Sequence, residues 1–68
     1  MSVILYSTHC PKCTVLETKL KDANVDFELE TDMDVMIKKG FMSAPKLEVD
    51  GKVMEFGDAI KWVNDKLN

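Results

Sequence analysis

The sequence predicts one α/β domain over residues 1–68, in which a four-stranded mixed sheet carries helices on both faces. The 68 residues leave room for only one hydrophobic core. Apolar residues make up 46% of the chain and charged residues 31%, which is typical of a compact globular domain. Short apolar runs also alternate with segments of helical periodicity, in the order strand, helix, strand, helix, strand, strand, helix.

The first strand and the first helix follow from a change of periodicity near residue 10. Val3–Tyr6 is continuously apolar, as in a central strand that is covered on both faces. From Pro11 to about Ala23 the spacing becomes helical, and Pro11 suits a first turn, where its missing N–H costs nothing. Cys10 is therefore expected at the N-cap or in the first turn. The apolar face of this helix would consist of Cys13, Val15, Leu16 and Leu20.

The next two elements are a strand and a short helix. Alternation predicts a strand with a buried face formed by Val25, Phe27 and Leu29, parallel to the first strand because a helix connects the two. Asp32 can cap a helix that ends at 38–40, where two lysines precede a glycine. The apolar residues of this helix are Met33, Met36 and Ile37.

A hairpin and a final helix complete the predicted domain. The hairpin is indicated by the turn signal Asp50–Gly51, which lies between two short apolar runs. Its strands would contain Leu47, Val49, Val53, Met54 and Phe56. Gly57 and Asp58 are expected to open the last helix. The apolar face of that helix would be Ala59, Ile60, Trp62, Val63 and Leu67.

Charge and cysteine usage exclude several classes of protein. The formal net charge is -3 and the chain contains no arginine, which disfavours a nucleic-acid partner. The two cysteines, Cys10 and Cys13, are too close together for a disulfide between them to stabilise the fold much. No apolar run is long enough for a membrane span or a signal peptide. We therefore expect a monomeric cytoplasmic protein without a membrane partner.

Cys10-Pro11-Lys12-Cys13 lies between the first strand and the first helix, where such a pair is typical of redox-active thiols. Free N–H groups and the positive end of the helix dipole would stabilise a thiolate at Cys10, and Lys12 adds a cation. We predict that Cys10 is the nucleophile and that Cys13, one turn further on, is the resolving thiol. His9 could assist a proton transfer or could be an ordinary loop histidine.

Three segments carry a resemblance to a known family. Residues 6–13, 43–45 and 50–52, read as YSTHCPKC, SAP and DGK, resemble the glutaredoxin and NrdH-redoxin branch of the thioredoxin superfamily over essentially the whole chain. The resemblance implies a thioredoxin-like fold, as a single glutaredoxin-like domain, and a small dithiol–disulfide oxidoreductase. It also implies that Pro45 is cis and faces the dithiol, and that the backbone of Ala44 pairs with an extended substrate or with glutathione.

The same resemblance implies a set of binding residues and partners. No bound cofactor is implied, because the thiols carry the chemistry. Electrons would come from glutathione or from a flavin-dependent thioredoxin reductase, and the substrates would be protein disulfides, with ribonucleotide reductase as one candidate, or glutathione mixed disulfides. The implied binding residues are His9, Pro11, Lys12, Ala44, Pro45, Gly57 and Asp58. For Gly57 and Asp58 the residues themselves leave a second interpretation, in which they are only a turn and the N-cap of the last helix.

Three other functions could use the same cysteines. The first is a carrier of a soft metal such as copper or zinc. A structural zinc site needs four ligands, whereas this chain offers Cys10, Cys13 and His9, so a second chain or carboxylates would have to complete it. The second is a dimer that bridges a [2Fe–2S] cluster through Cys10. The third is a redox-inert binding module. Purification without colour and without stoichiometric metal would weigh against the first two.

Overall fold

A computed structural model describes residues 2–67 of the chain. Within this range no helix is both long enough and apolar enough to cross a membrane. The predicted order of strands and helices is confirmed. The elements of the described chain are β1 (Val3–Tyr6), α1 (Pro11–Asp22), β2 (Glu28–Glu30), α2 (Met33–Lys38), β3 (Lys46–Val49), β4 (Lys52–Met54) and α3 (Phe56–Leu67).

The strands form a mixed sheet in the order β2-β1-β3-β4. β1 and β2 are parallel, since α1 carries the chain back to the same end of the sheet, and Leu5 lies beside Leu29 in their register. β3 is antiparallel to both β1 and β4. Asp50 and Gly51, which connect β3 to β4, have φ values of 50° and 87°, as a two-residue turn with both central residues at positive φ requires.

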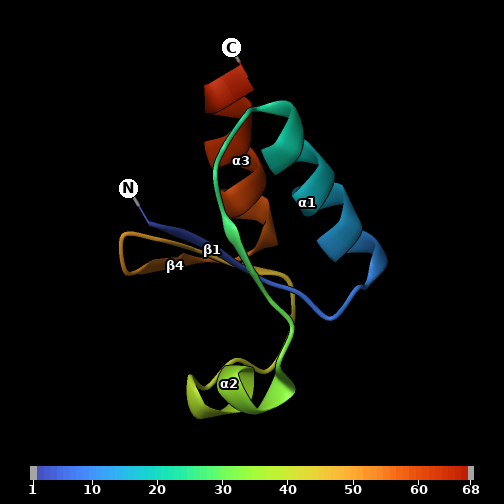
Figure 1. The fold of residues 1–68 in the computed structure, drawn as a ribbon, viewed down its shortest axis with the longest axis vertical. Coiled ribbons are helices and arrows are strands. Elements are labelled where there is room, and N and C mark those ends of the chain that lie inside the picture. The colour runs from blue at the N-terminus through green and yellow to red at the C-terminus, as the bar shows by residue number, and fades with distance from the viewer. Residues whose placement is uncertain (1, 68) are drawn as a thin grey trace.

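The helices cover both faces of the sheet, as predicted. α1 and α3 lie side by side on one face, and the short α2 lies on the other (Figure 1). The main core fills the space between the sheet and the α1–α3 pair. Its fully buried side chains include Leu5, Leu16, Leu20, Leu47 and Val63. α2 buries only one of its residues, Met36, so little apolar area attaches it to the rest of the molecule.

Several residues predicted to be buried are exposed. Leu29 is 45% exposed, because β2 is an edge strand that is shorter than the alternation indicates. Val15 of α1 is also exposed, because it lies away from the line of Cys13, Leu16 and Leu20 that faces the core. Met33 and Ile37 of α2 are exposed as well, and so is Leu67 in the last turn of α3.

The start of α3 also differs from the sequence prediction. The helix begins at Phe56, which the alternation assigns to the hairpin, and not at Gly57–Asp58. The N–H of Ala59 donates to the carbonyl of Glu55 at 2.8 Å, so the first helical hydrogen bond already spans these residues. Asp58 therefore lies in the first turn, where its negative charge is favourable near the helix N-terminus, and is not the N-cap.

Candidate active site

Cys10 is the N-cap residue of α1, as predicted. Its backbone is extended, and its Sγ accepts a hydrogen bond from the N–H of Cys13 at 3.2 Å. Its carbonyl accepts from the N–H of Thr14 at 3.0 Å. Pro11 follows as the first helical residue and needs no partner for its nitrogen. Both cysteines are free thiols, Cys10 partly exposed and Cys13 fully buried, so only the sulfur of Cys10 is open to a large substrate.

The buried thiol of Cys13 lies in a polar environment. Burial raises its pKa, but contacts with the Cys10 side chain, the Thr8 backbone and the Ser7 hydroxyl outweigh this effect, and the net direction is a lowered pKa. Thr8 Oγ1 lies 4.0 Å from the Cys13 Sγ. The buried Ser7 Oγ accepts the N–H of His9 at 3.0 Å, which leaves its proton free to donate. These contacts favour the ionised form of the Cys13 thiol, which is the form that a resolving thiol uses.

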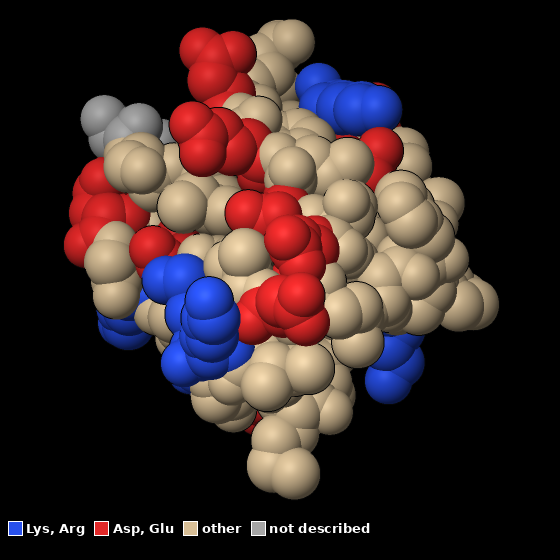
Figure 2. All heavy atoms as spheres, turned by 60° about the horizontal axis from the view of Figure 1, so that its bottom comes forward, with Lys and Arg blue, Asp and Glu red and all other residues tan. Residues whose placement is uncertain are grey.

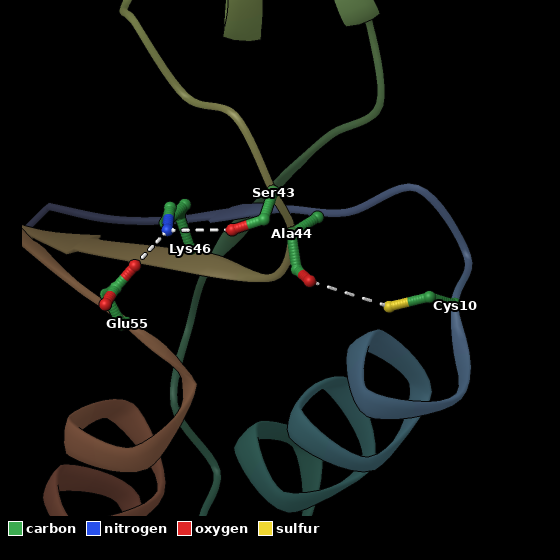
Figure 3. A network of polar contacts seen from close by, with 5 residues as sticks. All are labelled: Cys10, Ser43, Ala44, Lys46 and Glu55. Carbon is green, nitrogen blue, oxygen red and sulfur yellow. Dashed lines mark hydrogen bonds and ion pairs between the residues drawn. The ribbon is translucent and has the colours of Figure 1, made fainter.

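The proline loop faces the dithiol. The peptide bond between Ala44 and Pro45 is cis, as the sequence resemblance implied. The carbonyl oxygen of Ala44 lies 3.9 Å from the Sγ of Cys10, within hydrogen-bonding distance of a thiol (Figure 3). The backbone of Ala44 therefore forms one side of the surroundings of the Cys10 sulfur.

A cavity of about 370 Å³ lies beside this contact. It brings together four of the predicted binding residues, namely Lys12, Ala44, Pro45 and Gly57. The Nζ of Lys12 lies over the ring of Phe56, 5.6 Å from its centroid, so this cation bridges the start of α1 and the start of α3. The remaining lining residues are Ser43, Lys46, Glu55 and Phe56.

The other three predicted binding residues do not line this cavity. His9 precedes Cys10 in an exposed turn, with its backbone at a φ of 61°. Pro11 is exposed at the first position of α1, and Asp58 is exposed in the first turn of α3. All three nevertheless flank residues of the site in the chain. Whether any of them contacts a substrate stays a prediction.

A second cavity, of about 250 Å³, lies between α2 and the proline loop and shares Ser43 and Ala44 with the first. It is largely apolar, and Met33, Ile37 and Met42 in its wall are exposed, Met42 almost completely at 99%. Figure 2 brings this end of the molecule forward and shows acidic side chains across the middle of the face, a basic group directly beside them, and broad uncharged surface around both. The lining residues are Thr8, Met33, Met36, Ile37, Phe41, Met42, Ser43 and Ala44.

The sequence did not reveal every residue of the site. Ser7 and Thr8 contact the resolving thiol, but hydroxyl residues before a helix are too common to indicate this role. Lys46 is buried and bonded to Ser43 and Glu55, although a lysine in an alternating strand is normally assigned to the solvent face. The Phe56 partner of Lys12 could only be found once α1 and α3 were placed together.

Metal ligands are sparse around the thiols. Among residues 2–67, no group of three or more His, Cys, Asp or Glu side chains is arranged to hold a metal ion. A soft metal bound by Cys10 and Cys13 would therefore need ligands from another molecule.

The fold and this geometry define a class of protein: an α/β domain that holds a dithiol at a helix N-terminus opposite a cis-proline loop. Residues 1–64 match a family described as a thioredoxin domain, and the chain belongs to this family. The predicted superfamily and thioredoxin-like fold are thus confirmed, whereas the glutaredoxin or NrdH branch stays a prediction.

The chain is also similar to a thioredoxin of Methanothermobacter thermautotrophicus. The two are 30% identical over 63 residues, which cover 84% of this chain and 82% of the relative. No solved structure matches the chain. Family membership supports thiol–disulfide oxidoreductase activity in general.

Proposed function

We propose that this protein is a dithiol electron carrier that reduces disulfides of other proteins through Cys10 and Cys13. The observation that carries the proposal is the position of Cys10: its sulfur is partly exposed, accepts a helix N–H and lies against the carbonyl of Ala44. Exposure and a helix N–H at the sulfur are features of a nucleophilic cysteine, and the Ala44 carbonyl lies where a bound substrate segment would meet it. The family match supports the same chemistry.

The reaction balances without any bound cofactor. The thiolate of Cys10 attacks one sulfur of the substrate disulfide, a mixed disulfide forms, and the other substrate sulfur leaves and takes up a proton. The thiolate of Cys13 then attacks the Sγ of Cys10. The second substrate sulfur leaves as a thiol, and a Cys10–Cys13 disulfide remains. The substrate gains two electrons and two protons, and the protein loses them.

The two cavities on either side of Ala44 suit a protein substrate. An extended segment that carries the disulfide could lie along Ala44, with one flank toward the apolar wall at Met42 and the other toward Lys12. The Cys10–Cys13 disulfide must be reduced again after each turnover, which needs a reducing compartment, and we propose that the protein works in the cytoplasm. Glutathione mixed disulfides, which the resemblance also implies, would use the same two thiols.

Trapping of the mixed disulfide tests the mechanism. A Cys13→Ser variant lacks the resolving thiol, so Cys10 should stay joined to its substrate. With insulin as the protein disulfide, we expect one insulin molecule bound covalently per molecule of variant, detected by mass spectrometry and released by dithiothreitol.

A Cys10→Ser variant is the matched control, because it has the same sequence change at the other thiol, and it should capture no insulin. Capture through Cys13 instead of Cys10 would contradict the assignment of the nucleophile. Absence of capture by both variants would contradict the proposed function.

The two kinds of protein that the sequence resembles differ in their source of electrons, which is glutathione for one and a flavin-dependent thioredoxin reductase for the other. We propose that a flavin-dependent thioredoxin reductase recharges the Cys10–Cys13 disulfide, since the chain is similar to a thioredoxin and has Gly57 alone where glutaredoxins have a glycine pair. Insulin reduction with NADPH and this reductase should be at least about tenfold faster than with glutathione and glutathione reductase. The reverse order would assign the protein to the glutathione-dependent branch.

A further inference from the structure

Lys46 is an unusual residue beside the site. Among residues 2–67, the buried polar side chains are Ser7 and Lys46, and the side chain of Lys46 is only 10% exposed. Lysine is almost never buried without a partner, because an ammonium loses its hydration in the interior. The role of the dithiol does not account for this residue.

The ammonium of Lys46 joins three segments of the chain. Its Nζ donates to the Oγ of Ser43 at 3.2 Å and forms an ion pair with the carboxylate of Glu55 (Figure 3). Ser43 precedes Ala44 and Pro45, Lys46 follows them, and Glu55 is the residue before α3. The contacts thus form a clasp, Ser43–Lys46–Glu55, around the segment whose carbonyl faces Cys10.

The Glu55 end of the clasp carries its charge at neutral pH. The hydrogen bond from Lys46 and the charge of Lys46 lower the pKa of Glu55, so its carboxylate stays ionised. Glu55 itself is 79% exposed, and its carboxylate is therefore held by Lys46 and not by burial.

Stability gives no clear reason for a charge at this position. Only the Lys46 side of this ion pair is buried, and its partner Glu55 is largely exposed to solvent, so the desolvation of the ammonium offsets much of a weak attraction. A methionine at position 46 would fill the same space. What it could not do is hold Ser43 and Glu55 in fixed places.

We propose that Lys46 is a positioning residue whose contacts with Ser43 and Glu55 fix the Ala44 backbone opposite Cys10 and so set the affinity for a protein disulfide. This inference rests on the proposed function. The clasp also lines the cavity beside Ala44 and contributes to the surface that the substrate segment meets. Lys46 does not touch the reacting sulfurs, so the intrinsic reactivity of Cys10 should not depend on it.

Two substrates of different size separate docking from chemistry. Pre-reduced protein is mixed with insulin or with bis(2-hydroxyethyl) disulfide, and single turnovers are stopped with iodoacetamide, so no reductase is needed. The Lys46→Met variant should need an about tenfold higher insulin concentration for half-saturation, with an unchanged maximal rate, as expected from the loss of a charge-assisted contact. Its rate with the small disulfide should stay within about twofold of the parent protein.

Control variants keep the test decisive. Lys52→Met removes an exposed lysine of β4 and should change neither reaction. Lys46→Arg keeps the charge and should restore most of the affinity for insulin. Glu55→Gln changes a side chain that is 79% exposed and keeps a carbonyl oxygen that can accept from Lys46, so the variant should fold even if Lys46→Met does not. It should raise the half-saturating insulin concentration about threefold.

The outcomes distinguish the two proposals. If the parent protein reduces neither disulfide, the proposed function fails. If the parent reduces both, and Glu55→Gln and Lys46→Met bind insulin like the parent, only the positioning role fails. A proportional loss with both substrates would assign Lys46 to the chemistry or to the fold, and would also overturn the positioning role.

Discussion

A Cys10→Ser variant should lose disulfide reduction by at least about a thousandfold, because Cys13 cannot take over the attack. The sulfur of Cys13 is fully buried behind the first turn of α1, where no protein disulfide can reach it. The loss should appear with insulin and with bis(2-hydroxyethyl) disulfide alike. Single-turnover rates of the pre-reduced variant, compared with the parent protein, measure it.

The substitution at position 10 should leave the fold intact, so a loss of activity would report on the thiol itself. Serine is among the preferred N-cap residues and can accept the N–H of residue 13 in place of the sulfur. The urea midpoint should therefore stay close to that of the parent. Iodoacetamide should label Cys10 of the parent well before Cys13. A variant that still reduced insulin at a tenth of the parent rate would show that Cys13 is reachable, and would contradict the assigned roles.

The predicted elements were most accurate where the signal is local. Pro11 marks the start of α1, and Asp50–Gly51 marks the turn between β3 and β4, because each residue restricts or extends the backbone angles at its own position. The N-cap position of Cys10 follows from the same local reasoning. The positions of the two thiols could thus be predicted from the sequence, because their spacing and the start of the helix that carries them are both determined by neighbouring residues.

Features that depend on distant segments could not be predicted. The alternation of Val25, Phe27 and Leu29 is the same for an edge strand and for a central strand, and only the order β2-β1-β3-β4 decides that Leu29 stays exposed. The partner of Lys46 is nine residues away, beyond the hairpin, so no periodicity indicates the clasp. Ala44 and Pro45 entered the site through the family resemblance alone, because nothing local indicates that their loop folds back to Cys10.

The largest expected effect on stability is that of Leu5→Ala. Leu5 is fully buried in the central strand β1, in the core under α1 and α3. Removing a leucine side chain from a rigid core costs about 2–5 kcal/mol, because a cavity remains in addition to the lost burial. A domain of this length is expected to have roughly 3–10 kcal/mol of stability in total, so the variant should lose a large share of its stability and unfold at a much lower urea concentration. Urea unfolding followed by circular dichroism measures the loss.

Leu29→Ala is the matched control, since Leu29 is the neighbour of Leu5 in the β1–β2 register and the chemical change is identical. Leu29 is 45% exposed, so its truncation leaves no closed cavity and should cost less than about 1 kcal/mol. The substitution is the same at both positions, and the two residues are partners in the register, so the difference between the variants measures the burial that the central strand β1 provides and the edge strand β2 does not. Equal losses in the free energy of unfolding for both variants would mean that Leu29 is buried in solution. The alternation in the sequence would then describe β2 correctly, and its exposed edge position would be wrong.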